Sequence, residues 1–203
     1  MIDTYLSIKA PTAARITRKK SRFIGLLYPA SNKQEVEALL AQAKRNYHDA
    51  THHCSAYRLA EDSGLVTHAD DAGEPAGSAG KPILQQLEAA DLTDVLAVVV
   101  RYFGGSKLGV GGLIRAYADA TKEAIAAAAL VEIKRRTRLS IRFSPELSSR
   151  VMGLLHRHPI EIEQVSYNEE ARVLVAVPPS LLRRFSQELQ EATGARARIE
   201  EET

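Results

Sequence analysis

The residues best able to do chemistry form a glycine-rich segment, Arg101-Tyr-Phe-Gly-Gly-Ser-Lys-Leu-Gly-Val-Gly-Gly-Leu113. It follows an apolar run at 95–100, typical of a buried strand, and precedes an alanine-rich helical run. A glycine-rich turn between a strand and a helix can point backbone N–H groups at an anion. We therefore expect an anion-binding site made by Arg101, Tyr102, Gly104, Gly105, Lys107, Gly109, Gly111, Gly112 and Arg115. The alternative is that the glycines serve close packing and positive-φ turns.

The same segment does not match two common phosphate-binding motifs. The chain has no glycine–lysine pair followed by serine or threonine, which a P-loop requires. The dinucleotide fingerprint needs glycine or alanine at position 114, where Ile114 stands. The expected site is therefore a backbone nest with cationic partners, and we expect no cofactor.

A second segment, residues 70–82, combines carboxylates with glycines. Its acidic residues are Asp70, Asp71 and Glu74. They could hold a hard cation or form ion pairs with Arg101 and Lys81, although their spacing does not match a calcium loop. A plain acidic surface loop is the other interpretation. Gly77 and Gly80 indicate a second nest at a helix start, and the sequence does not decide whether the two segments share a groove.

The third candidate is the run His52-His-Cys54, which suggests a thiol nucleophile or a metal ligand set. Alternation along a strand places His53 on the opposite face from His52 and Cys54. Neighbouring residues of a strand therefore cannot converge on one metal ion. We expect Cys54 to be a small buried side chain, and we predict neither a metal site nor catalytic residues.

Basic residues also gather at Lys19, Lys20 and Arg22. Basic clusters can contact phosphates, and the rings of Tyr102 and Phe103 could stack on bases of a nucleic-acid strand. A solvated surface and ring packing under the glycine-rich segment are the alternatives.

The composition is that of a globular protein. The chain has 203 residues, 45% hydrophobic and 26% charged, with a net charge of +2, which fits one large or two small domains. A single cysteine excludes an internal disulfide and fits a reducing compartment. Neither a signal segment nor a membrane-spanning apolar run is visible, so we expect a cytoplasmic protein that does not bind membranes.

Apolar spacing predicts a mixed α and β first part. The expected elements are a strand or hairpin over 15–28, a helix over 34–47 with a capping box at Ser31 and Gln34, a strand over 52–58, a loop over 61–80, a helix over 79–90, a strand over 95–102 and a helix over 111–131.

A charged run at 134–138 lacks apolar periodicity and predicts a hinge. After it, the pattern indicates a strand near 139–143, a helix from Ser144, strands over 160–167 and 172–177, a helix that Gly194 ends, and a last strand over 195–200. This β-α-β-β-α-β order is the ferredoxin-like plan.

Taken together, these segments resemble the IMPACT family, in its bacterial YigZ branch. The matching stretches are 101–113, Asp70-Asp-Ala-Gly-Glu-Pro-Ala-Gly-Ser-Ala-Gly-Lys-Pro82, His52-His-Cys54 and Lys20-Ser-Arg-Phe23. The resemblance covers essentially the whole chain in one order. It implies an α+β protein: a ribosomal-protein-like (second-domain type) α/β sandwich over 1–134 and a ferredoxin-like domain over 135–203.

The resemblance also implies a link to translation. Eukaryotic members interfere with activation of a starvation-sensing kinase through an additional N-terminal domain. The family core begins here within the first 20 residues, so we do not expect that partner. Some relatives carry a proline-peptidase label, but the sequence shows no paired-metal ligand set to support it.

We therefore expect a non-enzymatic regulator of translation that binds ribosome or RNA. Arg101, Lys107 and Arg115 would contact phosphates, with additional contacts from Lys19, Lys20, Arg22 and Lys81. One alternative is a phosphate- or nucleotide-binding enzyme of kinase-like fold in which Asp70 or Asp71 holds Mg²⁺. The other is an adaptor for an acidic protein. The sequence does not give the oligomeric state.

Overall fold

The structure is a computed structural model that describes residues 2–61 and 63–202. The chain separates into two compact units, one formed by Tyr5–Ile133 and the other by residues 2–4 with 134–202. Both units mix helices with antiparallel sheets, and the described residues form five α-helices in all.

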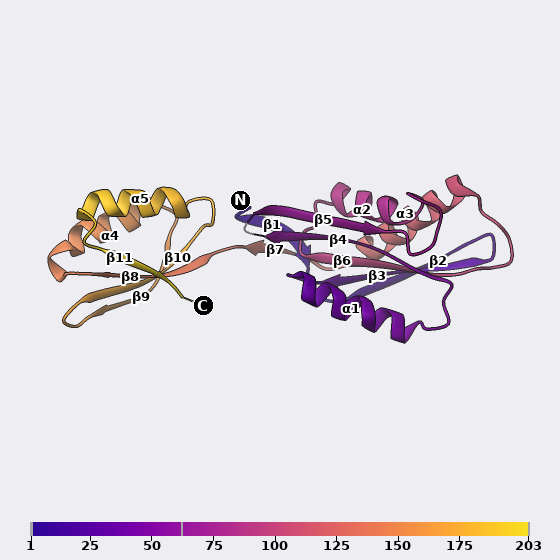
Figure 1. The fold of residues 1–203 in the computed structure, drawn as a ribbon, viewed down its shortest axis with the longest axis horizontal. Coiled ribbons are helices and arrows are strands. Elements are labelled where there is room, and N and C mark those ends of the chain that lie inside the picture. Colours follow the sequence, from indigo (N-terminus) through magenta and orange to yellow (C-terminus); the bar gives the residue numbers. More distant parts are fainter. Residues whose placement is uncertain (1, 62, 203) are drawn as a thin grey trace. The chain divides into compact units, whose positions relative to one another are not determined.

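A five-stranded sheet organises the Tyr5–Ile133 unit (Figure 1). Its strands, in spatial order, are β2 (Thr12–Arg18), β3 (Ser21–Pro29), β6 (Val95–Tyr102), β4 (His52–Glu61) and β5 (Gly64–Asp70). Every neighbouring pair is antiparallel. The apolar run predicted as a buried strand is β6, which takes the centre because β-branched residues fit a sheet covered on both faces.

Helices cover both faces of this sheet. α2 (Gly80–Ala89) and α3 (Val110–Ala126) lie on one face, and α1 (Lys33–Asn46) lies on the other (Figure 1). Alternate residues of β6 enter the two cores: Val99 packs with α2 and α3, whereas Val100 packs with α1. The same alternation turns the next odd residue, Arg101, toward α2 and α3.

Two predicted boundaries in this unit are wrong. The expected loop over 61–80 contains the edge strand β5, whose mostly exposed side chains leave no apolar alternation in the sequence. The helix expected over 111–131 ends at Ala126, and Leu130–Lys134 forms β7, which pairs with β1 (Thr4–Ile8). In both places tertiary strand pairing decided the local structure.

The predicted capping box of α1 is shifted by one residue. Asn32 is the N-cap, and its side chain accepts the N–H of Glu35 at 2.9 Å. The Glu35 carboxylate in turn accepts the N–H of Ser31 at 2.7 Å. The pattern is therefore a variant of the capping box, because Glu35 accepts the N–H of the residue before the N-cap rather than that of the N-cap itself. Gln34 takes no part in it.

The second unit has the predicted order of elements. They are β8 (Thr137–Phe143), a 3-10 turn (Pro145–Leu147), α4 (Ser148–Arg157), β9 (Glu161–Tyr167), β10 (Ala171–Val177), α5 (Leu182–Thr193) and β11 (Arg198–Glu201). The sheet order is β11-β8-β10-β9, antiparallel throughout, with both helices on one face (Figure 1). Gly194 ends α5 in the left-handed region, as predicted, whereas the last strand begins only at Arg198.

Candidate functional site

The glycine-rich segment forms the loop between β6 and α3. Gly105 and Gly109 adopt positive φ angles of +83° and +70°, which other residues rarely adopt. The carbonyl of Gly109 accepts the N–H groups of Gly112 and Leu113 at 3.1 and 3.0 Å, which starts the helix. Within the described residues no side chain caps α3, and its first turn carries no carboxylate. The start of this helix therefore remains electropositive.

This loop lies against the hairpin turn between β2 and β3. A Cβ atom at Gly104 would stand 2.1 Å from the carbonyl carbon of Lys20, and the Gly104 N–H donates to Ser21 Oγ at 3.1 Å. Lys19 and Lys20 form the turn itself and are exposed. Exposed Lys107 follows three residues after Gly104 along the loop, so the contact brings the loop that contains Lys107 beside the hairpin turn.

Tyr102 and Arg22 belong to the opposite face of the sheet. The guanidinium of Arg22 stacks 4.0 Å from the centre of the Tyr102 ring. The Tyr102 hydroxyl donates to Asp49 at 2.8 Å. Strand alternation thus directs both residues away from Arg101, and the structure does not bring them together with the other expected site residues.

Arg101 is buried and engaged in an ion pair. Only 6% of its surface is exposed, and its Nη1 donates to Glu74 Oε1 at 2.5 Å. The Tyr117 hydroxyl donates to the same oxygen at 2.7 Å, and His52 Nε2 lies 3.9 Å from it. The charge of Arg101 is therefore already neutralised by Glu74 rather than presented to solvent.

Cys54 contacts Tyr117, one of the partners of Glu74. Its Sγ lies 2.9 Å from the carbonyl oxygen of Asp71 and 3.3 Å from the Tyr117 hydroxyl. Burial raises the pKa of the Cys54 thiol to about 12, and burial likewise raises the pKa of Tyr117 above its usual range. At neutral pH the thiol is protonated, so the residue has the character of a buried small side chain rather than of a nucleophile.

The two neighbouring histidines point to different faces. His52 Nδ1 lies 2.9 Å from the Ala72 carbonyl oxygen, whereas His53 Nε2 lies 3.0 Å from that of Tyr47. Across the part of the chain that the structure describes, no three His, Cys, Asp or Glu side chains are arranged to hold a metal ion.

The second predicted nest, at Gly77 and Gly80, is occupied by the carboxylate of Asp71. The Asp71 carboxylate accepts the N–H groups of Gly77, Ala79 and Gly80 at 2.7, 2.9 and 2.8 Å. Burial acts to raise the pKa of Asp71, but these three donors outweigh it and hold the pKa below its usual range. This nest at the start of α2 is closed by an internal contact, while Lys81 beside it is exposed.

The segments 70–82 and 101–115 do share a pocket, of about 330 Å³. The pocket is lined by Thr51, His52, Glu74, Pro75, Arg101, Phe103, Lys107, Leu108, Gly109, Val110 and Leu113. Its walls are largely apolar, with the buried ion pair and exposed Lys107 among them. Arg115, Lys81 and the two hairpin lysines do not line it.

The sequence did not place Thr51 or His52 in the pocket that both of them line. His52 is the register partner of Arg101 on the neighbouring strand, and Thr51 Oγ1 accepts the N–H of Phe103 at 3.1 Å. Both contacts follow from the pairing of β4 with β6, which joins segments about 50 residues apart in the chain. The spacing within either segment gives no signal of this pairing.

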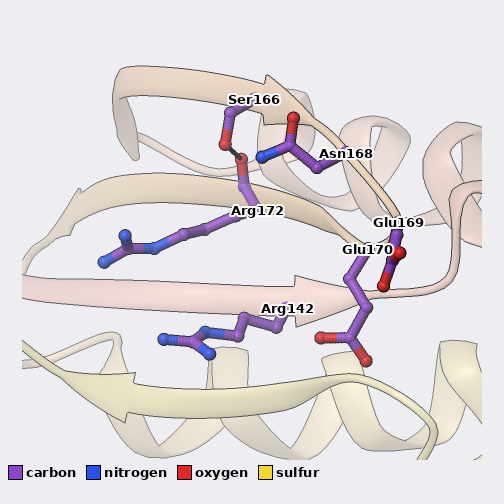
Figure 2. A pocket seen from close by; sticks show the side chains of 6 residues that line it. All are labelled: Arg142, Ser166, Asn168, Glu169, Glu170 and Arg172. Atoms are coloured by element: carbon purple, nitrogen blue, oxygen red, sulfur yellow. Dashed lines mark hydrogen bonds between the residues drawn. The ribbon is translucent and has the colours of Figure 1, made fainter.

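A second cavity, of about 500 Å³, lies in the other unit. Figure 2 shows Arg142 of β8 and Arg172 of β10 extending in the same direction, with Glu169 and Glu170 near the turn that follows β9. The two arginines are direct register partners. Arg142 pairs with Glu200 at 3.2 Å, and Arg172 pairs with Glu202. This cavity is of mixed charge, and its arginines have carboxylate partners.

These features define a class of protein: a two-unit α+β protein whose larger unit carries a glycine-rich loop beside a pocket, followed by a helix whose start has no side-chain cap. The description "Impact N-terminal domain" belongs to the family profile that matches residues 19–125. The chain belongs to the IMPACT family.

Relatives match along nearly the whole length. The chain is 33% identical to IMPACT family member YvyE of Bacillus subtilis, over 99% of this chain and 92% of that protein. It is 32% identical to IMPACT family member YigZ of Escherichia coli, over 93% of each. A crystal structure described as that of a hypothetical protein aligns with a TM-score of 0.68 at 30% identity, covering 98% of this chain and 97% of the other. None of the helices in the described residues is long and apolar enough to cross a membrane.

Proposed function

We propose that this protein is a cytoplasmic, non-enzymatic regulator of translation that binds RNA, as free strand or within the ribosome, through a basic surface. That surface consists of Lys19, Lys20, Lys107 and Arg115. The link to translation comes from the IMPACT family, and the RNA-binding role comes from the geometry of the loop. We also infer that the larger unit is ribosomal-protein-like and that the smaller unit, with its β-α-β-β-α-β order, is ferredoxin-like.

One observation carries the proposal: the backbone contact between Gly104 and Lys20. It places the exposed lysines of the hairpin turn beside the loop that contains Lys107. The uncapped start of α3 adds a positive dipole end on the same loop, and Arg115 is exposed one turn further along that helix. Several exposed cations on one surface are the electrostatic footprint of phosphate-backbone binding.

The structure changes the part expected of Arg101. Because its guanidinium is paired with Glu74, Arg101 supports the loop, and the phosphate contacts fall to the exposed lysines and Arg115. The Mg²⁺-dependent alternative is weaker, because Asp71 is engaged by three backbone N–H groups and Asp70 accepts the N–H of Ala72 at 2.8 Å. An adaptor that binds an acidic protein would use the same cations, so the experiment must separate it from RNA binding.

The test is binding to ribosomes, to separated subunits and to a short single-stranded RNA across a salt series. Lys19→Ala/Lys20→Ala/Lys107→Ala removes three cations of the surface. The matched control, Lys33→Ala/Lys44→Ala/Arg45→Ala, removes three cations from α1 on the other face of the sheet. We expect the first variant alone to lower the slope of log affinity against log salt by about 2, since each single-strand phosphate contact contributes about 0.7. Salt-independent binding, or equal effects of the two variants, would contradict the proposal.

A further inference from the structure

We propose that the pocket between segments 70–82 and 101–115 is a seat for one unstacked nucleobase of the bound RNA strand. This inference rests on the proposed function, because the basic surface must first bring the RNA backbone to the loop. It adds that the protein contacts a base as well as phosphates.

The pocket and the basic surface are parts of one loop. Lys107 lines the pocket, while Gly104, three residues earlier, lies against Lys20 of the hairpin turn. A strand whose phosphates follow the lysines therefore passes the pocket opening. The volume of about 330 Å³ falls within the roughly 300–1,000 Å³ of small-ligand sites.

The walls of the pocket offer apolar and aromatic surface, part of which is exposed to solvent. Phe103 is 48% exposed and Val110 is 53% exposed, although both line the pocket, together with Leu108 and Leu113. Single-stranded nucleic acids bind to such rings because every base has a π-face that stacks on an aromatic side chain. A bare anion gains nothing from these walls, so they favour a ligand with a flat apolar body.

The pocket also holds polar groups that suit the edge of a base. The guanidinium carbon of Arg101 lies 5.6 Å from the centre of the Phe103 ring, so donors stand next to the stacking surface. The Arg101 Nε is buried without a hydrogen-bond partner among the described residues, and the three contacts of Glu74 converge on its Oε1. Adjacent donors and acceptors at the end of an aromatic wall are the usual means of reading an unstacked base.

Charge supports the same occupant. Arg101 and Glu74 neutralise each other, which leaves Lys107 as the net charge of the lining. A neutral base fits inside the pocket, and its own phosphate meets Lys107 at the exposed side. A small dianion would instead require more than one uncompensated cation in the lining.

The experiment compares two short single-stranded oligonucleotides of equal length and charge, one with bases and one abasic, by fluorescence anisotropy. We expect wild-type protein to bind the oligonucleotide with bases more tightly. Phe103→Ala should lower that affinity by about five- to a hundredfold, the effect of losing one base–aromatic stack. The salt slope should not change, because no phosphate contact is lost, and the abasic strand should bind wild type and variant alike.

Two further variants serve as controls. Phe103→Tyr keeps a ring at the position and should retain the affinity. Tyr167→Ala removes an aromatic residue of the other unit, 57% exposed, and should have no effect. Equal binding of the two oligonucleotides, or a lower salt slope in Phe103→Ala, would overturn the base seat and leave the proposed function intact. Absence of binding to any RNA at low salt would overturn both.

Discussion

Gly104 and Lys20 are in backbone contact, so that a methyl group on Gly104 would stand 2.1 Å from the Lys20 carbonyl carbon. The contact joins the hairpin turn to the loop that follows the central strand. It explains the glycine at this position by close approach of two backbones. The neighbouring Gly105, in contrast, has open space around it and a positive φ. Two adjacent glycines therefore serve two different physical needs.

A first prediction concerns this contact. Gly104→Ala should lower the free energy of unfolding by about 1–3 kcal/mol, because backbone atoms must move to admit the methyl group. Gly111→Ala is the matched control: the nearest atom to its Cβ would be 4.0 Å away, and alanine is the better helix former. It should stabilise by about 0.4–1 kcal/mol. Urea unfolding of both variants checks the pair, and a similar loss in both would contradict the contact.

A second prediction concerns the buried ion pair. Arg101→Ala or Glu74→Ala alone should destabilise by about 3–5 kcal/mol, since each leaves an uncompensated buried charge. The double variant Arg101→Met/Glu74→Leu should lose less than the sum of the two single variants. Arg18→Ala, which breaks the exposed pair with Asp119, should cost less than about 1 kcal/mol. Chemical denaturation measures all four, and additive losses in the double variant would exclude coupling.

A third prediction concerns the pH dependence that Asp71 contributes. Its folded pKa lies below the unfolded value of about 3.9. The stability that it contributes is therefore present above about pH 4 and is lost as the pH falls through the folded pKa. The difference in unfolding free energy between wild type and Asp71→Asn should narrow from pH 6 toward pH 2. A difference that stays the same across this pH range would contradict the prediction.

A fourth prediction concerns the Cys54 thiol, whose folded pKa of about 12 lies above the unfolded value of about 8.5. The stability linked to it is fully present below about pH 8.5 and is lost as the pH rises toward 12. The advantage of wild type over Cys54→Ala should therefore shrink by up to about 1.4 kcal/mol per pH unit in this window. Thiol reagents at pH 8 should label the unfolded protein and spare the folded one, and rapid labelling of the folded protein would contradict the burial.

The sequence predicted the strongly periodic elements well. The central strand over 95–102 is confirmed, because its apolar run requires burial on both faces. The β-α-β-β-α-β order of the second unit is confirmed as well, because alternating strands and amphipathic helices leave little ambiguity. The errors fell on β5 and β7, strands that pair with β4 and β1. Local spacing contains no information about such partners.

The sequence identified many residues of the candidate site but assigned several of them the wrong role. Counting along β6 from Val99 turns Arg101 toward α2 and α3, where it forms with Glu74 the ion pair that was one interpretation of segment 70–82. The phosphate contact expected of Arg101 required exposure, but Arg101 is buried. The glycines Gly77 and Gly80 likewise predicted an anion-binding nest. The sequence did not indicate that the carboxylate of Asp71 would occupy it. Which group occupies a site depends on distances that only the folded chain sets.

The central strand β6 has a consequence for the time scale of motion at the site. β6 is hydrogen-bonded along both edges and packed on both faces, so its amides should be among the slowest of the unit to exchange with deuterated solvent. The glycine-rich loop follows directly after this strand in the chain. The strand that precedes the loop is therefore already rigid before a ligand binds. The loss of backbone conformational entropy on binding is confined to the few residues between Gly104 and Gly109.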